Sequence, residues 1–544
     1  MKIGIDLDNT LIAYDKVFAE CGAECGYLPS NWQGNKSEVK AYLLAFDGGE
    51  KIWQILQGQV YGRYLYRAEL FPGVHRFLLR CKVRDIGVEI ISHKTEYGHE
   101  DLHRVSLRRA ALAFLSQKGL YSTREKKLID RVVFCDTRSE KISRIVKGSY
   151  DWFIDDLQEV LTAARQVNCT KTMLFQPNQG SDSDVEFSAR SWNQIEQELL
   201  GKWDYSELAS VSRKVIGSKP LNIEWVGGRG NSGVAKASLH DGRSLAVKIY
   251  SDDLHHDRLQ SEYEGYLLIR DSAVKNVPES VVRSKDLNIA AYSWIEGEPI
   301  NIPNEKDIDE AIVFVDKLFQ LSRGQRAQNF QNASAAIFSG QSATQQMLRR
   351  IELLQRDCVQ GSPLAKYLKK ELSPMSEEIL KSTEREWGGP LDYSDIIPRS
   401  GCTLSPSDFG FHNAIRTPAN EIVFLDFEYF GWDDPAKLMG DFLLHPGMGL
   451  TSELGYRWIV GVKKIFGDES LRRLARLWPT LQMLWCLIVL NVYIKEVVYR
   501  RLLANSSMSR EWGEVLERQL RISQSRLASA QLNSWKFPYL DLIS

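Results

Sequence analysis

Three side chains between residues 405 and 428 have the types and the spacing needed to move a phosphoryl group. Asp408 is followed five residues later by Asn413, and Asp426 comes directly after the apolar run 422–425. Phosphoryl transfer from a nucleotide needs a carboxylate that orients and deprotonates a hydroxyl, and an amide and a second carboxylate that hold magnesium. We therefore predict that Asp408 is a catalytic base and that Asn413 and Asp426 are ligands of Mg²⁺. The alternative interpretation is an ordinary loop followed by an edge strand.

A second set of reactive groups begins at the N-terminus. Asp6 and Asp8 follow a short apolar strand pattern, at the edge where open α/β sheets place their ligands. Two such carboxylates can divide the labour, because one attacks phosphorus as a nucleophile while the other gives a proton to the leaving oxygen. Mg²⁺ would offset their crowded negative charge.

Four later residues complete this second set. Ser92 ends an apolar run and offers a hydroxyl to a phosphoryl oxygen, and Lys141, with Lys147 as its rival, would offset phosphate charge. Asp155 and Asp156 end another apolar strand and are expected to bind Mg²⁺ together with Asp6 and Asp8. Each of these residues also has an ordinary structural interpretation, as a turn residue, a solvated helix face or a helix N-terminus.

Residues 1–200 resemble the haloacid-dehalogenase-like phosphatase superfamily through these motifs. The matching positions are Asp6, Asp8 and Thr10, then Ser92, Lys141, Asp155 and Asp156. The resemblance implies that the insertion at about residues 12–71 is a cap that closes on the substrate and selects it. The phrase Ile-Ser-His-Lys-Thr-Glu-Tyr-Gly is similar to a small branch of the superfamily that occurs with surface-glycan synthesis genes.

A glycine-rich hairpin and a strand lysine follow in the second half. The segment 227–233 reads Gly-Gly-Arg-Gly-Asn-Ser-Gly, and glycines let backbone amides approach nucleotide phosphates because they carry no Cβ atom. Lys248 is the one cation in an apolar strand pattern, which suits contact with phosphates. We expect Glu262 on the next helix to be its ion-pair partner, with Glu264 as second choice. The predicted ATP-binding residues are Gly228, Gly230, Ser232, Gly233, Lys248 and Glu262.

Residues from about 221 to the C-terminus resemble the aminoglycoside-phosphotransferase and choline-kinase-like family at these positions. The lysine loop Gly-x4-Gly-Lys-Ser/Thr is absent from the sequence, so ATP use here would require the two-lobed arrangement that the resemblance implies. The sequence departs from the family at one place, where Pro406, Ser407 and Asp408 replace His-Gly-Asp or His-Asn-Asp. The histidine supports loop geometry in the family, so the resemblance still implies that Asp408 acts.

The length of 544 residues suggests two to four domains. We predict a multidomain α/β and α+β protein that begins with a Rossmann-like parallel sheet and a helical cap in residues 1–200. A linker at 201–220 would lead to a two-lobed protein-kinase-like fold, with an N-lobe at 221–297 and a largely helical C-lobe at 298–544.

Composition argues against several classes of partner. The formal net charge of −1 creates no basic field that would attract nucleic acid or an anionic membrane. The longest apolar run, 481–494, is interrupted by Gln482 and Asn491 and is too short to span a bilayer, so we expect a core helix and no membrane insertion.

The N-terminus leads straight into an acidic strand end and does not have the pattern of a signal peptide. Scattered cysteines suit a reducing compartment, so we expect a cytoplasmic protein.

The hypothesis that unites both sets of residues is a bifunctional enzyme of small-molecule metabolism. One half would transfer phosphate from ATP to a hydroxyl, and the other would hydrolyse a phosphomonoester with Mg²⁺. A sugar or sugar phosphate of surface-polysaccharide synthesis is the expected substrate, on the resemblance of the first half. In one alternative, one domain is inactive and serves as a regulator or scaffold. In another, the protein heals nucleic-acid ends, which the near-neutral charge and the missing lysine loop disfavour.

Overall fold

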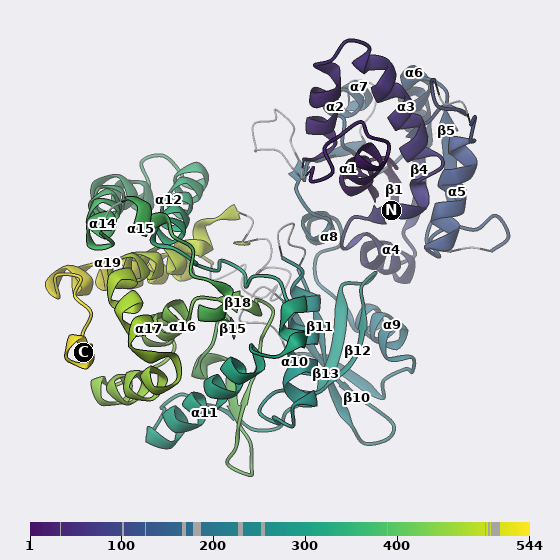
Figure 1. Ribbon diagram of the computed structural model, residues 1–544. Helices are drawn as coiled ribbons and strands as arrows, with labels where there is room; N and C mark the ends of the chain where they lie inside the picture. Colours follow the sequence, from purple (N-terminus) through teal and green to yellow (C-terminus); the bar gives the residue numbers. More distant parts are fainter. Residues whose placement is uncertain are drawn as a thin grey trace. The chain divides into compact units, whose positions relative to one another are not determined.

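The computed structural model divides the chain into two compact units (Figure 1). Unit 1 comprises Met1–Lys214 and Ser284–Asn288, and unit 2 comprises Val215–Arg283 and Ile289–Ser544. The structure describes all residues except 33, 101–102, 126, 166–169, 178–186, 227–231, 252–255, 389, 496, 499–500, 502–511 and 544, and it also leaves out the side chains of 390–391.

Unit 1 is built around a parallel sheet of six strands in the order β5-β4-β1-β6-β7-β8. In chain order the strands are β1 (Lys2–Ile5), β4 (Gly87–His93), β5 (Arg131–Cys135), β6 (Trp152–Asp155), β7 (Lys171–Phe175) and β8 (Ser188–Ala189). Because all strands run the same way, their carboxyl ends lie along one edge of the sheet.

The central strand β1 fixes the position of the first acidic motif. Ile3 and Ile5 are fully buried, and Ile5 is in register with Ile90 of β4 and Ile154 of β6. A Cβ atom on Gly4 would lie 2.5 Å from the ring of Phe153, so this strand can approach β6 only with glycine at that position. The chain leaves β1 at Asp6, which therefore lies next to the ends of β4 and β6.

Helices cover the sheet of unit 1. The helix α4 packs against β4, α6 against β4 and β5, and α7 against β6 and β7. The helices are α4 (Val74–Val83), α5 (Leu107–Gln117), α6 (Arg138–Gly148), α7 (Gln158–Arg165), α8 (Trp192–Leu200) and α9 (Tyr205–Ile216).

Three mutually packed helices form the segment between β1 and α4, which we call the cap segment. They are α1 (Asp15–Glu24), α2 (Lys36–Leu44) and α3 (Gly49–Tyr61), followed by the 3-10 helix η1 (Leu65–Arg67). The helix α2 begins with a capping box, in which the Asn35 side chain accepts from the Glu38 N–H and the Glu38 side chain accepts from the Asn35 N–H. The short strands β2 (Ile12–Ala13) and β3 (Glu69–Leu70) pair with each other in antiparallel fashion, so the two ends of the cap segment lie side by side.

A buried network of charges joins α4 to α8 and α9. Glu196 lies between Arg76 and Arg80, with N–O distances of 2.7 and 3.1 Å, and Arg80 also contacts Glu207 at 2.9 Å. All four side chains are fully buried. Each guanidinium therefore depends on these carboxylates for the electrostatic stabilisation that water would otherwise give.

Unit 2 begins with a five-stranded sheet in the order β12-β13-β11-β10-β9, in which β11 lies antiparallel to β10 and β13. The elements are β9 (Asn222–Trp225), β10 (Gly233–Ser238), β11 (Ser244–Ile249), β12 (Ser280–Ser284), β13 (Ile289–Ser293) and the helix α10 (Arg258–Asp271), which packs against β13. Small sheets follow, formed by β14 (Glu298–Pro299), β16 (Ala414–Arg416) and β17 (Ile422–Phe424), and by β15 (Thr403–Ser405) and β18 (Gly431–Asp433).

The rest of unit 2 is largely helical and packs around α17 (Ser452–Ile488). This element is broken at Gly467, whose φ of 80° and ψ of 173° are not helical. The other helices are α11 (Glu305–Leu321), α12 (Gly340–Asp357), α13 (Pro363–Tyr367), α14 (Ser373–Glu386), α15 (Pro390–Ser394), α16 (Pro435–Leu444) and α19 (Trp512–Leu532), with shorter helical turns η2 (Gln325–Asn329), η3 (Leu368–Leu372), η4 (Arg399–Gly401), η5 (Phe411–Asn413), η6 (Val489–Tyr493) and η8 (Leu540–Leu542).

One helical stretch among the described residues, Ser452–Tyr493, is long and apolar enough to cross a membrane. Of its most apolar window, 67% is buried inside the structure, which fits the core helix that the sequence predicts at this place.

We predict that Glu196→Ala lowers the free energy of unfolding of unit 1 by about 3–5 kcal/mol, because the substitution leaves two buried guanidiniums without their shared carboxylate. Urea unfolding followed by circular dichroism measures the change. Glu198→Ala, at an exposed position of the same helix, is the control and should change stability by no more than about 0.5 kcal/mol. Equal effects of both substitutions would contradict the role given to the network.

Candidate functional site

The first acidic motif forms a buried cluster at the carboxyl edge of the parallel sheet. Asp6 follows β1, Asp155 ends β6, and carboxylate oxygens of Asp6, Asp155 and Asp156 all lie within 4.8 Å of one another. Lys141 of α6 places its Nζ 2.6 Å from Asp6 Oδ1 and 2.6 Å from Asp155 Oδ2. The structure thus brings Asp6 together with Lys141, Asp155 and Asp156, which lie far from it in the sequence.

Charge in this cluster is not balanced by the lysine. Burial raises the pKa of Asp6 well above its ordinary value, and the charges of Asp155 and Asp156 add to the effect although Lys141 opposes it. Burial and the charge of Asp155 likewise raise the pKa of Asp156 to about 6. Mg²⁺ prefers carboxylate oxygens, and these three carboxylates fit such an ion because it would relieve their mutual repulsion.

Two other predicted residues complete the cluster. The Oγ atom of Ser92 on β4 is buried and has no hydrogen-bond partner among the described residues. An unpartnered buried hydroxyl is costly, and a phosphoryl oxygen would satisfy it. Of the two lysines that the sequence left open, Lys141 is buried against the carboxylates, whereas no ion pair of Lys147 is found in the described part of the chain.

Asp8 is placed differently from the sequence prediction, which grouped it with the Mg²⁺ ligands. Its Oδ2 lies 2.8 Å from Lys94 Nζ, and its Oδ1 accepts a hydrogen bond of 2.5 Å from Tyr14 Oη. The group of carboxylates close enough to share an ion contains Asp6, Asp155 and Asp156 but not Asp8. Lys94 and Tyr14 were missed by the sequence analysis, although Lys94 comes two residues after Ser92 and directly follows β4.

In unit 2, a buried lysine likewise gathers acidic residues. Lys248 on β11 places its Nζ 2.5 Å from Glu262 Oε2 on α10 and 2.5 Å from Asp426 Oδ1. Tyr250 and Tyr266 donate hydrogen bonds of 2.9 Å to the two oxygens of Glu262. Glu262, rather than Glu264, is therefore the ion-pair partner of Lys248, while Glu264 pairs with Arg283 at 2.7 Å.

Glu428 is a fourth member of this cluster that the sequence analysis missed. Its Oε2 lies 3.6 Å from Lys248 Nζ and accepts a hydrogen bond from Ser232, and its Oε1 lies 2.6 Å from Arg258 Nη1. The signal was present in the sequence, since Glu428 comes two residues after Asp426. Of the predicted nucleotide-binding residues, Gly233 begins β10 and Ser232 directly precedes it, whereas Gly228 and Gly230 lie outside the described residues.

The three carboxylates of this cluster carry more negative charge than Lys248 and Arg258 neutralise. Burial opposes the charge of Lys248, yet Asp426, Glu262 and Glu428 together hold its pKa well above the ordinary value. Burial and the charges of Glu428 and Glu262 raise the pKa of Asp426 to about 7, although Lys248 acts in the other direction. These three carboxylates lie close enough to share one cation, so Mg²⁺ fits here too.

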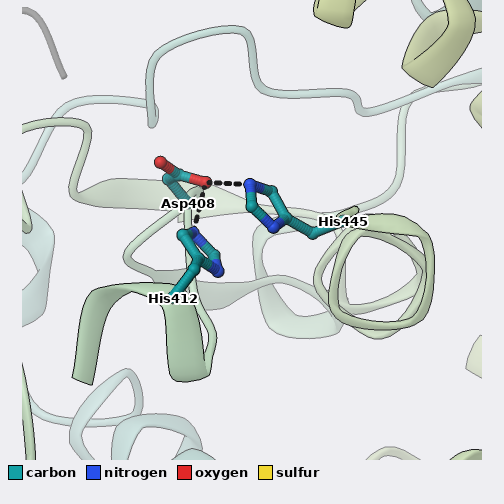
Figure 2. A group of neighbouring side chains, drawn as sticks. All are labelled: Asp408, His412 and His445. Atoms are coloured by element: carbon teal, nitrogen blue, oxygen red, sulfur yellow. Dashed lines mark hydrogen bonds and ion pairs between the residues drawn. The ribbon is translucent and has the colours of Figure 1, made fainter. Parts of the chain in front are cut away.

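The predicted base, Asp408, is held in its ionised form. His412 Nε2 lies 3.0 Å from Asp408 Oδ1 (Figure 2). Asn413 Nδ2 donates to Asp408 Oδ2 at 3.3 Å. Burial opposes ionisation, but the hydrogen bond and charge of His412 outweigh it and lower the pKa of Asp408 to about 2. Its side chain remains 37% exposed, so the carboxylate is open to a substrate.

His445 supports this arrangement from the end of α16. Its ring stacks on that of His412, with centroids 3.5 Å apart, and its Nε2 lies 3.9 Å from Asp408 Oδ1 (Figure 2). Burial and the charge of His412 lower the pKa of His445 to about 4, so its ring is neutral at pH 7. The Gly447 N–H donates to His445 Nδ1 at 3.0 Å, which leaves the ring proton on Nε2. Asp408, His412 and His445 lie close enough to share a metal ion, but a protonated Nε2 has no lone pair to offer a metal, so His445 acts here through its ring contact with His412.

Asn413 lies between the base and the acidic cluster. Its backbone carbonyl accepts a hydrogen bond of 2.8 Å from Leu425 N–H, which brings it beside Asp426. Its amide nitrogen donates to Asp408, so the amide oxygen is left for a cation. Asp426 itself has a φ of 64° and Ser407 a φ of 66°, and left-handed backbone at non-glycine residues is costly and typical of functional sites.

A cavity of about 540 Å³ in unit 2 is lined by residues that contact the Lys248 cluster and the segment before Asp408. His256, Arg399 and the segment 331–335 line it. His256 Nε2 donates to the Glu428 carbonyl oxygen at 3.0 Å, and the Ser334 carbonyl accepts from Ser407 Oγ at 3.2 Å. The wall of the cavity is thus tied to the Lys248 cluster on one side and to the residue before Asp408 on the other.

Comparisons with known proteins find partial likenesses among solved structures. No family model and no curated protein matches the chain. A spectinomycin phosphotransferase in complex with ADP and spectinomycin is 12% identical, with a TM-score of 0.41, over 60% of this chain and 98% of that chain. A choline kinase from Streptococcus pneumoniae is 15% identical, with a TM-score of 0.39, over 57% of this chain and 94% of that chain. Likenesses at this level assign neither a family nor an activity to this chain.

We predict that the metal-free chain loses stability as pH rises through about 6, and that Mg²⁺ restores it. Asp156 has a pKa of about 6 in the folded state against an ordinary value of 3.8, so the folded state binds the proton more tightly. The resulting stabilisation is complete below about pH 4 and is lost as the group ionises. Thermal unfolding in EDTA and in Mg²⁺ at several pH values measures the effect.

Asp156→Asn provides the test of cause, because it removes the ionisation and leaves a side chain of similar size. The variant in EDTA should show a smaller loss of unfolding temperature between pH 5 and pH 7.5 than the unchanged chain. An identical pH profile of the two proteins would contradict the assignment to Asp156.

Proposed function

We propose that the protein is a bifunctional enzyme that transfers phosphate from ATP to a hydroxyl in unit 2 and hydrolyses a phosphomonoester in unit 1. The observation that carries the proposal is the same in both units. In each unit, a buried lysine pairs with carboxylates that lie at distances fitting Mg²⁺. A further carboxylate outside that group, Asp8 in unit 1 and Asp408 in unit 2, can move a proton.

In unit 2, Asp408 is the proposed base. Its low pKa keeps it ionised at neutral pH, and it accepts the proton of the acceptor hydroxyl as the oxygen attacks the terminal phosphate of ATP. Lys248, held by Glu262, contacts nucleotide phosphates. Asn413 and Asp426 would hold Mg²⁺, with Glu428 close enough to Asp426 to share the ion. The ion, when bound, neutralises charge that develops on the phosphoryl oxygens. The cavity beside Ser407 and Glu428 is the proposed acceptor pocket, and its polar lining suits a sugar or sugar phosphate.

In unit 1, Asp6 is the proposed nucleophile. One of its oxygens forms a bond to phosphorus while the ester P–O bond breaks, and Asp8, in its protonated form, gives its proton to the leaving oxygen. Water then attacks phosphorus, the bond between Asp6 and phosphorus breaks, and Asp8 takes the proton that the water loses, which returns both residues to their starting state. Ser92 Oγ and Lys141 Nζ contact phosphoryl oxygens, and Asp6, Asp155 and Asp156 hold Mg²⁺.

We predict that Asp6→Asn and Asp408→Asn separate the two activities. Asp6→Asn should lower phosphate release by at least about 100-fold and leave ATP use intact, whereas Asp408→Asn should do the reverse. Phosphate release from sugar phosphates and ADP formation with sugars, both with Mg²⁺, are the two assays.

Asp47→Asn and Asp395→Asn are matched controls, because both carboxylates are exposed and belong to the same units. They should leave both activities unchanged. Phosphate release that persists in Asp6→Asn, or ADP formation that persists in Asp408→Asn, would refute the corresponding half. A unit that is inactive in the unchanged chain against every substrate would instead favour a regulatory or scaffold role for that unit.

A further inference from the structure

Two lysines stand beside the proposed phosphatase centre in addition to Lys141. Lys94 is almost fully buried, with 2% of its side chain exposed, and its Nζ contacts both oxygens of Asp8, at 3.0 and 2.8 Å. Lys36 is the first residue of α2 in the cap segment and is partly buried. Neither lysine takes part in the hydrolysis proposed above.

One tyrosine connects the two lysines. Lys36 Nζ donates a hydrogen bond of 2.8 Å to Tyr61 Oη, and Lys94 Nζ lies 4.7 Å from the centroid of the Tyr61 ring. The Tyr61 ring also meets the Tyr14 ring edge-on at 4.7 Å, and Tyr14 donates to Asp8. The last residue of α3 thus ties the ammonium of Lys36 to the side of the site where Asp8 lies.

Among the described residues, the ammonium of Lys36 contacts a tyrosine hydroxyl and forms no ion pair with a carboxylate. Burial opposes the charge of Lys36, but Tyr61 and the charges of Asp8 and Asp156 raise the pKa of Lys36. The ammonium therefore stays protonated and interacts electrostatically with the acidic site. No carboxylate lies within ion-pair distance of its Nζ in the part of the chain that the structure describes. An ammonium carries three donors, and Tyr61 accepts one of them. A partly buried cation with open donors is a favourable partner for an anion.

The position of Asp8 shows which part of a substrate would meet this cation. Lys141, Ser92 and the acidic cluster surround the transferred phosphoryl group, whereas Asp8 must face the leaving oxygen to which it gives a proton. Lys36 and Tyr61 approach from the cap segment on the Asp8 side. Any charged group that they bind is therefore carried by the leaving alcohol.

We propose that Lys36, with Tyr61 and Lys94 beside it, binds a second anionic group on the leaving alcohol, so that the substrate of unit 1 is a doubly anionic phosphomonoester. The second group is a carboxylate or another phosphate, as in a phosphorylated sugar acid or a sugar bisphosphate. The inference rests on the proposed phosphatase function and names the substrate class of that site.

Matched pairs of substrates test the inference in the full-length protein with Mg²⁺. Phosphoglycerate differs from glycerol phosphate by a carboxylate, and a hexose bisphosphate differs from a hexose monophosphate by a phosphate. We predict that the doubly anionic member of each pair has the higher kcat/KM. Lys36→Gln should raise KM roughly 10-fold for that member and leave the singly charged member unchanged, since one charge-assisted contact is lost.

Two further variants separate recognition from structure. Lys36→Arg keeps the charge and should retain most of the preference, and Lys40→Gln, at an exposed position of the same helix, should retain all of it. A structural role of Lys36 would weaken both members of a pair equally. Equal kcat/KM for both members in the unchanged protein, or an unchanged ratio in Lys36→Gln, would overturn the inference.

A binding measurement keeps failure of the inference distinct from failure of the phosphatase function. Isothermal titration calorimetry of Asp6→Asn with the same pairs reports affinity without turnover. If the unchanged protein releases no phosphate but Asp6→Asn binds phosphoglycerate more tightly than glycerol phosphate in a Lys36-dependent way, the hydrolysis is wrong and the anion subsite stands. If both turnover and the preference in binding are missing, both proposals fall.

Discussion

A buried ammonium that several carboxylates share determines the geometry of each site. Lys141 bridges Asp6 and Asp155 in unit 1, and Lys248 bridges Glu262 and Asp426 in unit 2. Removing any of these charges from water is costly, and the cost is offset only when the partners lie within hydrogen-bonding distance. The lysine therefore restricts where the carboxylates can lie, and the strands and helices that carry them must meet at that point.

Neither ammonium fully offsets the acidic charge around it. The pKa of Asp156 rises to about 6 and that of Asp426 to about 7, because burial and neighbouring carboxylates disfavour ionisation more than the lysines favour it. An excess of buried negative charge of this kind suits a divalent cation, which supplies more positive charge at one point than a further lysine would. The two units reach the same electrostatic arrangement with different sheets, one parallel and one antiparallel.

The two proposed proton carriers are held in contrasting ways. Asp408 accepts hydrogen bonds from His412 and Asn413 and remains more than one-third exposed, which suits a base that must meet a hydroxyl. Asp8 is instead fixed by Lys94 and Tyr14, and Tyr14 comes from the start of the cap segment. The cap segment thus touches the proton carrier directly, which links the recognition of a leaving group to the chemistry of unit 1.

The sequence by itself determined where the strands that carry the first acidic motif end. Asp6 and Asp155 come at the ends of apolar runs that form β1 and β6, so local patterns were sufficient for these positions. The choice between two candidate residues that lie close together in the sequence required the tertiary structure. Glu262 and Glu264 are two residues apart on α10 and so face different sides, and only the packing of α10 decides which side meets Lys248.

Only the tertiary structure decided which distant side chains complete each site. His445 reaches Asp408 because α16 packs against α17 and ends beside the loop, and no local pattern indicates this. Lys36 and Tyr61 meet Lys94 because three helices fold back over the carboxyl edge of β1 and β4. Contacts between segments far apart in the chain depend on how whole elements pack, and the periodicity of a single segment carries no information about that packing.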